Sequence, residues 1–269
     1  MSVSERVMKE YRYSGNYDFP LLAELYDRTE RFTDDIELLR RLIGNSGPLN
    51  ILECFSGTGR VLIPLALDGH RVTGIEMAPA MNARAAAKLA ELSATVQRRV
   101  TLKVQDALDR QWGTGYDLVI MADNAFYELP TAETQERCIQ LAHEALAPGG
   151  RLFIDNNDYK GDWPRGPFGR RRVIFEGHGA DGVFGRYSVV GLRFDEPQGI
   201  LHMRRTWFTR APDGTRRCVR YLGRKHPVRA SEVAGWLKKH RFRILQTLGD
   251  SHGNPYAKES DRAVFWARR

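Results

Sequence analysis

The chain has 269 residues and a formal net charge of +8, and it is 42% hydrophobic with 10% aromatic residues. This composition supplies enough apolar side chains for a sizeable core, so a wholly disordered chain is excluded. The charge is uneven, because residues 1–150 hold 16 Lys and Arg against 21 Asp and Glu, whereas residues 151–269 hold 25 against 12. We expect two regions with different tasks and an anionic partner for the second, although a solvated basic face would give the same pattern.

Membrane and secreted proteins are disfavoured by the sequence. The longest apolar run, residues 61–67, is too short to span a bilayer, and the first residues lack the apolar segment of a secretory signal. Cys54, Cys138 and Cys218 lie far apart and form no CxxC pair, which argues against a disulfide framework and against a zinc site. We therefore predict a cytoplasmic protein with no membrane segment and no metal.

The first part of the chain alternates helical and extended patterns. Residues 19–43 have the apolar spacing of a helical segment. From residue 48 to about 158, short apolar runs alternate with helical patterns, which is typical of a parallel sheet with crossover helices. The predicted strands are 50–55, 71–76, 100–104, 116–121 and 151–155. The predicted helices between them are 60–68, 79–92 and 131–146, and the last should end at the stop signal Pro148-Gly149-Gly150.

Residues 170–225 change character and become rich in β-forming residues. The predicted strands are 173–175, 183–194, 200–210 and 216–221, separated by turn signals at 197–199 and 212–214. Consecutive hairpins predict an antiparallel sheet added to the parallel one. After it, Ser231 can cap a helix that runs to His240, and strands follow at 242–248 and 263–267.

The turn after the first predicted strand is the most informative segment. Gly57 and Gly59 let the backbone approach a ligand closely at a helix N-terminus, and Glu76 closes the second strand, where an acid can accept hydrogen bonds from ribose hydroxyls. Leu62 stands where a dinucleotide-binding GxGxxG has its third glycine, and Glu53 would repel a pyrophosphate. These residues favour S-adenosylmethionine (SAM), which is cationic and phosphate-free, over NAD. For the glycines alone, an ordinary tight turn is the alternative.

The segment Glu53-Cys-Phe-Ser-Gly57-Thr-Gly59 resembles the first motif of the class I SAM-dependent methyltransferases, and Val104-Gln-Asp106-Ala107 is similar to their third-strand motif. Phe55 stands where that family most often has a glycine. The resemblance implies that Glu53 lies near the methionine ammonium, that Glu76 binds the ribose and that Asp106 meets the adenine amino group. The cofactor-binding residues expected in full are Tyr26, Glu53, Gly57, Thr58, Gly59, Glu76, Met77, Asp106, Ala107 and Asp123. For Met77, a surface-facing turn residue is the alternative.

The resemblance covers nearly the whole chain and implies an α/β fold. We expect a doubly wound, Rossmann-like, mostly parallel seven-stranded sheet with an antiparallel last strand, plus an antiparallel β insertion after strand five. The expected parts are a helical N-terminal lid at 1–46, a SAM-binding core at 47–160, the insertion on the acceptor side at 161–228, and a C-terminal helix with the final two strands at 229–269. The lid, here with Tyr26-Asp27, and the insertion give a closer resemblance to bacterial small-molecule methyltransferases, including glycine and amino-sugar N-methyltransferases.

Methyl transfer from a sulfonium is an in-line displacement that depends on holding the acceptor at near-attack distance. An amine acceptor needs only its neutral form, whereas a hydroxyl acceptor needs a general base. Candidate residues should lie at the carboxyl ends of the strands, where open α/β sheets bind ligands. The catalytic candidates are Asn124, Tyr127, Asp155 and His252, and the substrate-binding candidates are Asn156, Trp163, His226 and Tyr256. A structural imidazole is the alternative for each histidine, and sheet packing is the alternative for Trp163.

The leading hypothesis is a SAM-dependent methyltransferase that modifies a nitrogen, or else an oxygen, of a small polar or anionic metabolite. A nucleic-acid methyltransferase is the second hypothesis because of the basic C-terminal region, but the basic residues are scattered and no recognised nucleic-acid-binding motif accompanies them. A third is a SAM-binding protein without catalysis. The sequence leaves the acceptor open, and it leaves the oligomeric state open as well, a homodimer included.

Overall fold

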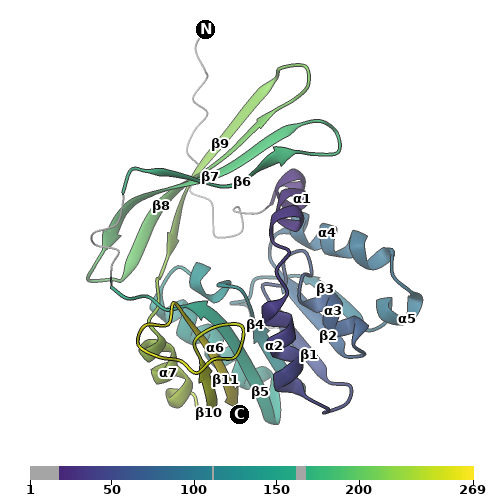
Figure 1. Ribbon diagram of the computed structural model, residues 1–269, viewed down its shortest axis with the longest axis vertical. Coiled ribbons are helices and arrows are strands. Elements are labelled where there is room, and N and C mark those ends of the chain that lie inside the picture. Colours follow the sequence, from purple (N-terminus) through teal and green to yellow (C-terminus); the bar gives the residue numbers. More distant parts are fainter. Residues whose placement is uncertain (1–17, 111, 162–167) are drawn as a thin grey trace.

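A computed structural model describes residues 18–110, 112–161 and 168–269 of the chain, so the prediction for Trp163 lies outside the described residues. In the described part, the strands form a seven-stranded sheet in the order β10-β11-β5-β4-β1-β2-β3 and a separate four-stranded sheet in the order β6-β7-β8-β9 (Figure 1). Within these ranges no helix is both long enough and apolar enough to cross a membrane.

The large sheet is parallel except at one strand. β11 runs antiparallel to both β5 and β10, and the other neighbouring pairs are parallel. The strands are β1 (Asn50–Cys54), β2 (Arg71–Glu76), β3 (Val100–Val104), β4 (Tyr116–Met121), β5 (Leu146–Asn157), β10 (Arg243–Leu248) and β11 (Arg262–Arg268). The predicted fold class, with its antiparallel last strand, is therefore confirmed.

Helices cover both faces of the large sheet, and the sequence of β4 explains why. Successive side chains of a strand point to opposite faces, and a strand buried on both sides is apolar throughout. Val119 and Met121 pack with α6 and α7, whereas Leu118 and Ile120 pack with α2 and α3. The helices are α1 (Pro20–Thr29), α2 (Asp34–Ile43), α3 (Leu62–Leu67), α4 (Pro79–Ala90), α5 (Ala94–Gln97), α6 (Ala132–Ala145) and α7 (Ala230–Lys239), with a short 3₁₀ helix η2 (Phe126–Glu128).

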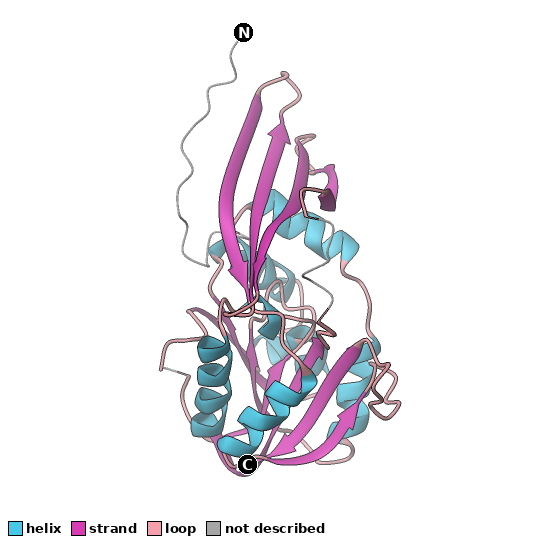
Figure 2. Cartoon of the chain, turned by 90° about the vertical axis from the view of Figure 1, so that its left-hand side faces the viewer, coloured by secondary structure: helices cyan, strands magenta, loops and turns pink. Residues whose placement is uncertain are grey.

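The small sheet consists of antiparallel hairpins that stand away from the large sheet (Figure 2). Its strands are β6 (Arg171–His178), β7 (Phe184–Asp195), β8 (Ile200–Arg210) and β9 (Arg216–Lys225). One face packs against α1, where Leu22 and Leu25 join an apolar cluster with Phe175, Tyr187 and Trp207. Because α1 also contacts α4, it lies between the small sheet and the helices of the large one (Figure 1).

Three local predictions differ from the structure. Residues 19–43 form two helices rather than one, because α1 packs on the small sheet while α2 packs on the large sheet. The stop signal at residues 148–150 lies inside β5, which begins at Leu146 and accommodates these residues through a register shift opposite β4. The helix α7 begins at Ala230, before the predicted cap Ser231, since the Asp158 carboxylate accepts a hydrogen bond from the Ala230 N–H.

Candidate active site

A cavity of about 500 Å³ lies where β1, β2 and β4 end, beneath α1 and the small sheet. This is the edge at which open α/β sheets bind ligands. The predicted residues that line it are Tyr26, Gly57, Glu76, Met77, Asp123, Asn124 and Tyr127. They come from α1 and from the ends of three strands, so the fold brings together residues that are up to a hundred positions apart in sequence.

The loop after β1 has a backbone that glycine adopts most easily. Phe55, Gly57 and Gly59 have φ angles of 62°, 54° and 79°. Glycine enters this left-handed region without strain, whereas a bulky residue such as Phe55 is an outlier there. Phe55 also lines the cavity, so its ring lies where the resembled family most often leaves a glycine. The Gly57 N–H donates a 3.0 Å hydrogen bond to Glu76 Oε2, which ties the loop to the end of β2.

Carboxylates dominate the part of the lining that faces the large sheet. Glu30, Glu76 and Asp123 all lie on the cavity wall. Burial raises the pKa of each of these three carboxyls. A buried carboxylate group of this kind is stabilised when a cation binds beside it. The described lining of this region therefore favours a cationic ligand.

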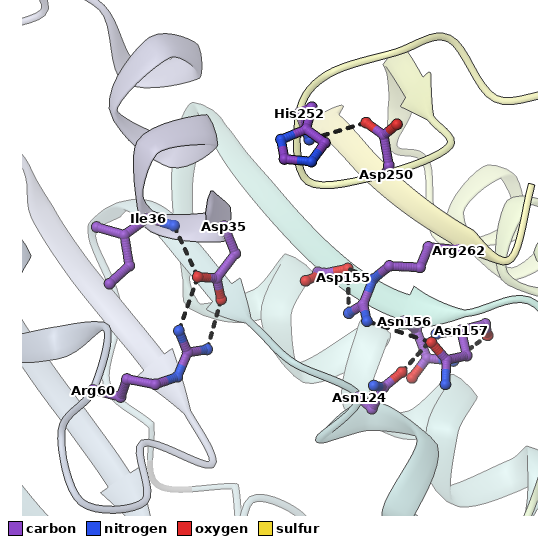
Figure 3. A network of polar contacts seen from close by, with 10 residues as sticks. All are labelled: Asp35, Ile36, Arg60, Asn124, Asp155, Asn156, Asn157, Asp250, His252 and Arg262. Carbon is purple, nitrogen blue, oxygen red and sulfur yellow. Dashed lines mark hydrogen bonds and ion pairs between the residues drawn. The ribbon is translucent and has the colours of Figure 1, made fainter. Parts of the chain in front are cut away.

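Behind the wall lies a further acid, Glu53. Its side chain is buried, and its Oε2 atom has no hydrogen-bond partner among the described residues. Burial raises the pKa of Glu53 to about 8, against the opposing effect of the Arg60 charge. Arg60 itself is held by Asp35, whose two carboxylate oxygens accept bonds of 2.8 and 2.6 Å from its guanidinium (Figure 3). Since Asp35 is fully buried, this pair is a fixed internal charge pair.

A second polar cluster fixes the ends of β4 and β5 (Figure 3). Asp155 Oδ1 accepts bonds of 2.9 and 2.7 Å from Arg262 of β11. Asn124 Oδ1 accepts a 2.6 Å bond from the Asn157 N–H, and the Asn124 N–H donates to the Asp155 carbonyl. Asn124 adopts a φ of 59°, which asparagine tolerates better than most residues. These contacts hold the loop that carries Asp123 and Asn124 in the cavity wall.

A larger cavity of about 660 Å³ adjoins the first and is enclosed mainly by the small sheet. The two share the wall residues Glu128, Arg172, Ile174 and Lys225. The second cavity has apolar walls and a different charge, because the only carboxylate in its described lining is Glu128. The basic residues of that lining are Arg170, Arg171, Arg172, Arg205 and Lys225.

Some predicted cofactor residues lie outside the 500 Å³ cavity. Thr58 turns away from it and donates a 2.5 Å hydrogen bond to Asp27 of α1. Asp106 bonds to the Leu108 N–H, and Ala107 is buried in the core. Gly59 is absent from the described lining as well. Their contacts with the cofactor stay predictions.

The remaining catalytic and substrate candidates are spread over the fold. Asp155 and Asn156 are buried beside the cavity without lining it. Tyr256 donates a 2.6 Å bond to Asp158, and His226 is buried against Gln135 on the wall of a third, separate cavity.

His252 is exposed, on the loop between β10 and β11. The Asp250 carboxylate accepts a hydrogen bond from the His252 N–H (Figure 3) and further bonds from the N–H groups of residues 253 and 254, which curls the loop. The His252 ring is absent from the described lining of the 500 Å³ and 660 Å³ cavities. A catalytic role for His252 stays a prediction.

Most of the residues that the small sheet contributes to the two cavities were not among the predicted site residues. Arg172 and Lys225 line both cavities, and Glu128 joins them from η2. The sequence held one signal for Arg205. This charged residue lies between the apolar Met203 and Trp207 on the same face of a strand. A charge at an inward-facing strand position is uncommon unless it is paired or functional.

The chemistry of the residues that line the first cavity suits SAM. The three wall carboxylates and the buried Glu53 suit an ammonium and a sulfonium, and Glu76 is placed at the end of β2, where it can accept bonds from ribose hydroxyls. The two cations of the described lining, Arg172 and Lys225, come from the small sheet and not from the glycine loop, where a pyrophosphate would bind. Among the described residues, no group of three or more His, Cys, Asp and Glu is arranged to hold a metal ion.

Comparisons with known proteins point to methyl transfer. Residues 52–152 match a family described as a methyltransferase domain. A protein of Geobacillus sp. (strain WCH70), provisionally named a methyltransferase, is 24% identical over 255 residues, which is 94% of this chain and 96% of the relative.

Two solved structures share the fold along almost their whole length. A sugar N-methyltransferase from Streptoalloteichus sp. ATCC 53650 has a TM-score of 0.72 and 19% identity, covering 100% of this chain and 98% of its own. A SAM-bound amino pentose methyltransferase from Micromonospora echinaspora has a TM-score of 0.64 and 19% identity, covering 93% and 97%. The methyltransferase-domain match, the relative and the shared fold of these structures support a class I SAM-dependent methyltransferase.

Proposed function

We propose that this enzyme methylates a nitrogen of a small polar acceptor, which binds in the 660 Å³ cavity of the small sheet. The observation that carries the proposal is the junction between the two cavities, where Glu128, Arg172, Ile174 and Lys225 belong to both walls. A cofactor in the acidic cavity and an acceptor in the other would meet at this junction. The names of the two structural neighbours, a sugar N-methyltransferase and an amino pentose methyltransferase, support the same acceptor class.

The contribution of the chain would be mainly to position its two ligands. Bound SAM supplies a methyl group on a cationic sulfur that leaves as a neutral thioether. Glu76 and Asp123 would hold the cofactor, and Tyr26 of α1, which also lines the cavity, would limit the access of water. Orientation of this kind can supply about 7 to 11 kcal/mol of a barrier. The acceptor nitrogen forms the new bond with its lone pair and gives a proton to solvent.

The junction carboxylate favours an amine over a hydroxyl acceptor. Although burial alone raises the pKa of Glu128, the charges of Arg205 and Lys225 outweigh burial and hold it at about 2. A hydroxyl acceptor needs a general base. A carboxylate with so low a pKa is too weak a base for this role near neutral pH. An amine needs only to be neutral, so its methylation requires no proton transfer to Glu128.

The test is transfer of a labelled methyl group from SAM to matched acceptors. Glucosamine and glucose share a skeleton and differ in one amine, and we expect label in the amine alone. Glu76→Ala should remove SAM binding and transfer together, whereas Glu91→Ala, which removes an exposed acid at the end of α4, should preserve both. Label on the hydroxyl groups of glucose would contradict nitrogen specificity. SAM binding without transfer to any amine would contradict the proposed acceptor class.

A nucleic-acid acceptor is the second candidate, because Arg216, Arg217 and Arg220 of β9 are exposed and could meet phosphates. Binding to a nucleic acid through such residues weakens steeply as salt rises. Titration of tRNA at low and at physiological salt therefore separates the two candidates. Tight, salt-sensitive binding together with labelled tRNA would replace the small-molecule acceptor, and we expect neither.

A further inference from the structure

A compact charge cluster lies at the junction of the two cavities. Arg205 and Lys225 both contact the carboxylate of Glu128, through a bond from Arg205 Nη2 and through a 3.2 Å bond from Lys225 Nζ. The Arg205 Nη1 atom also bonds to the Tyr187 hydroxyl at 3.2 Å, and the Lys225 Nζ atom lies 4.9 Å from the centre of the Tyr127 ring. The side chains of Arg205 and Lys225 are 2% and 15% exposed. The cluster is therefore largely shielded from bulk water.

The cluster carries more positive than negative charge. Two cations share the single carboxylate of Glu128, and Arg172 adds a third cation to the same wall. Arg170 and Arg171 line only the 660 Å³ cavity, all three of these arginines are exposed, and none of them forms an ion pair with a described residue. Of these cations, Arg205 and Lys225 are largely buried, and their two charges against the one carboxylate of Glu128 are unfavourable unless a further counter-charge accompanies them. An anion in the 660 Å³ cavity would supply that counter-charge.

We infer that Arg172 and Lys225, with Arg205 behind them, form a binding site for an oxyanion on the acceptor, a carboxylate or a phosphate group. This inference rests on the proposed function, since it assigns the charge of the molecule that is methylated. Arg172 is exposed at the start of β6, so it can move onto the ligand, while Lys225 is fixed by Glu128. Anchoring the acceptor at this wall leaves the rest of the molecule free to extend toward the carboxylates of the cofactor cavity.

The geometry also assigns a role to Glu128. Its two oxygens hold Arg205 and Lys225 apart on one wall, with Lys225 over the Tyr127 ring. Without the carboxylate, two buried cations would repel each other and the lysine would lose its fixed direction. Glu128 is thus a positioning residue for the anion site, and it leaves the excess positive charge available to the acceptor.

The experiment compares three amines that differ in charge: glucosamine, glucosamine 6-phosphate and glucosaminate. Binding is measured by calorimetry on the full chain saturated with S-adenosylhomocysteine. The wild type should bind at least one anionic amine about tenfold more tightly than glucosamine, and Arg172→Gln and Lys225→Met should each lose about tenfold of that preference. Arg220→Gln is the matched control, because it removes an exposed arginine from the same strand as Lys225. An unchanged circular dichroism spectrum shows that each variant is folded.

The outcomes separate this inference from the proposed function. The anionic amine that gains more affinity over glucosamine, the phosphate or the carboxylate, identifies which oxyanion the site binds. Equal affinity for all three amines, or an equal loss in Arg220→Gln, overturns the anion site even if the amines are methylated. If no amine binds, inorganic phosphate and acetate are titrated alone. Saturable binding that Arg172→Gln weakens then supports the site while the amine class fails, and no saturable binding overturns the site.

Discussion

Replacing Glu53 by glutamine should make the stability of the cofactor-free enzyme less sensitive to a rise in pH from about 5 to about 8. Glu53 lies in β1, is 4% exposed, and has one carboxylate oxygen without a described hydrogen-bond partner. Burial raises its pKa from the ordinary 4.5 to about 8, and the nearby Arg60 charge only partly opposes this. The folded protein therefore keeps the proton over a pH range in which the unfolded chain has released it.

The sign and size of the effect follow from this difference. Because the folded pKa is raised, the stabilisation from the Glu53 proton is complete below the unfolded pKa and disappears as the pH rises through the folded value. Between about pH 5 and about pH 8, linkage gives a loss of roughly 3 to 4 kcal/mol in the free energy of unfolding from this one group. Glu53→Gln cannot titrate, so its stability should lack this loss.

Urea unfolding of the wild type and of Glu53→Gln at both pH values measures the effect. Glu76, Asp123 and Asp155 also have raised pKa values, but they are present in both proteins, so the difference between the two curves isolates Glu53. SAM binding adds a second readout, since an ammonium beside Glu53 favours its ionised form, and binding near neutral pH should release more protons from the wild type than from Glu53→Gln. Equal pH dependence of unfolding in the two proteins would refute the reasoning.

Two further substitutions probe the support of the site. Asp35→Asn should lower the free energy of unfolding by roughly 3 to 5 kcal/mol in urea, because it strands the Arg60 charge in the interior, and a loss under about 1 kcal/mol would argue against a tight pair. Gly74→Ala in β2 should destabilise by about 1 to 3 kcal/mol and weaken SAM binding, because the new Cβ would lie 2.5 Å from Leu62 behind the glycine loop. The control Gly235→Ala meets open space in α7 and should stabilise by about 0.5 to 1 kcal/mol in thermal unfolding, so equal effects of the two substitutions would contradict the packing argument.

The large sheet and the glycine loop after β1 could be predicted because their sequence signals are local. β4 is apolar on both faces, and the spacing from Gly57 to Glu76 spans one helix between two strands. The direction of single side chains was harder to predict. Thr58 lies within the predicted motif, yet its hydroxyl bonds to Asp27, because α1 packs over the loop. Such a contact depends on tertiary packing that the motif does not contain.

The acceptor side could not be predicted from the sequence for a different reason. In a strand, a shift of one residue moves every side chain to the other face. The pairing of β7 with its neighbours has register shifts between Val173 and Phe175 and between Gly191 and Arg193. The sequence pattern does not locate these shifts, so it could not tell which arginines of the insertion face the cavity.

The central claim is that the cofactor occupies the acidic cavity and presents its sulfur to the basic one. A crystal structure of the enzyme with S-adenosylhomocysteine tests it most directly. We expect the ribose at Glu76, the amino group toward Glu53, and the sulfur facing the junction formed by Glu128 and Lys225. A sulfur turned away from that junction, or a cofactor bound outside the cavity of Glu76 and Asp123, would contradict the account.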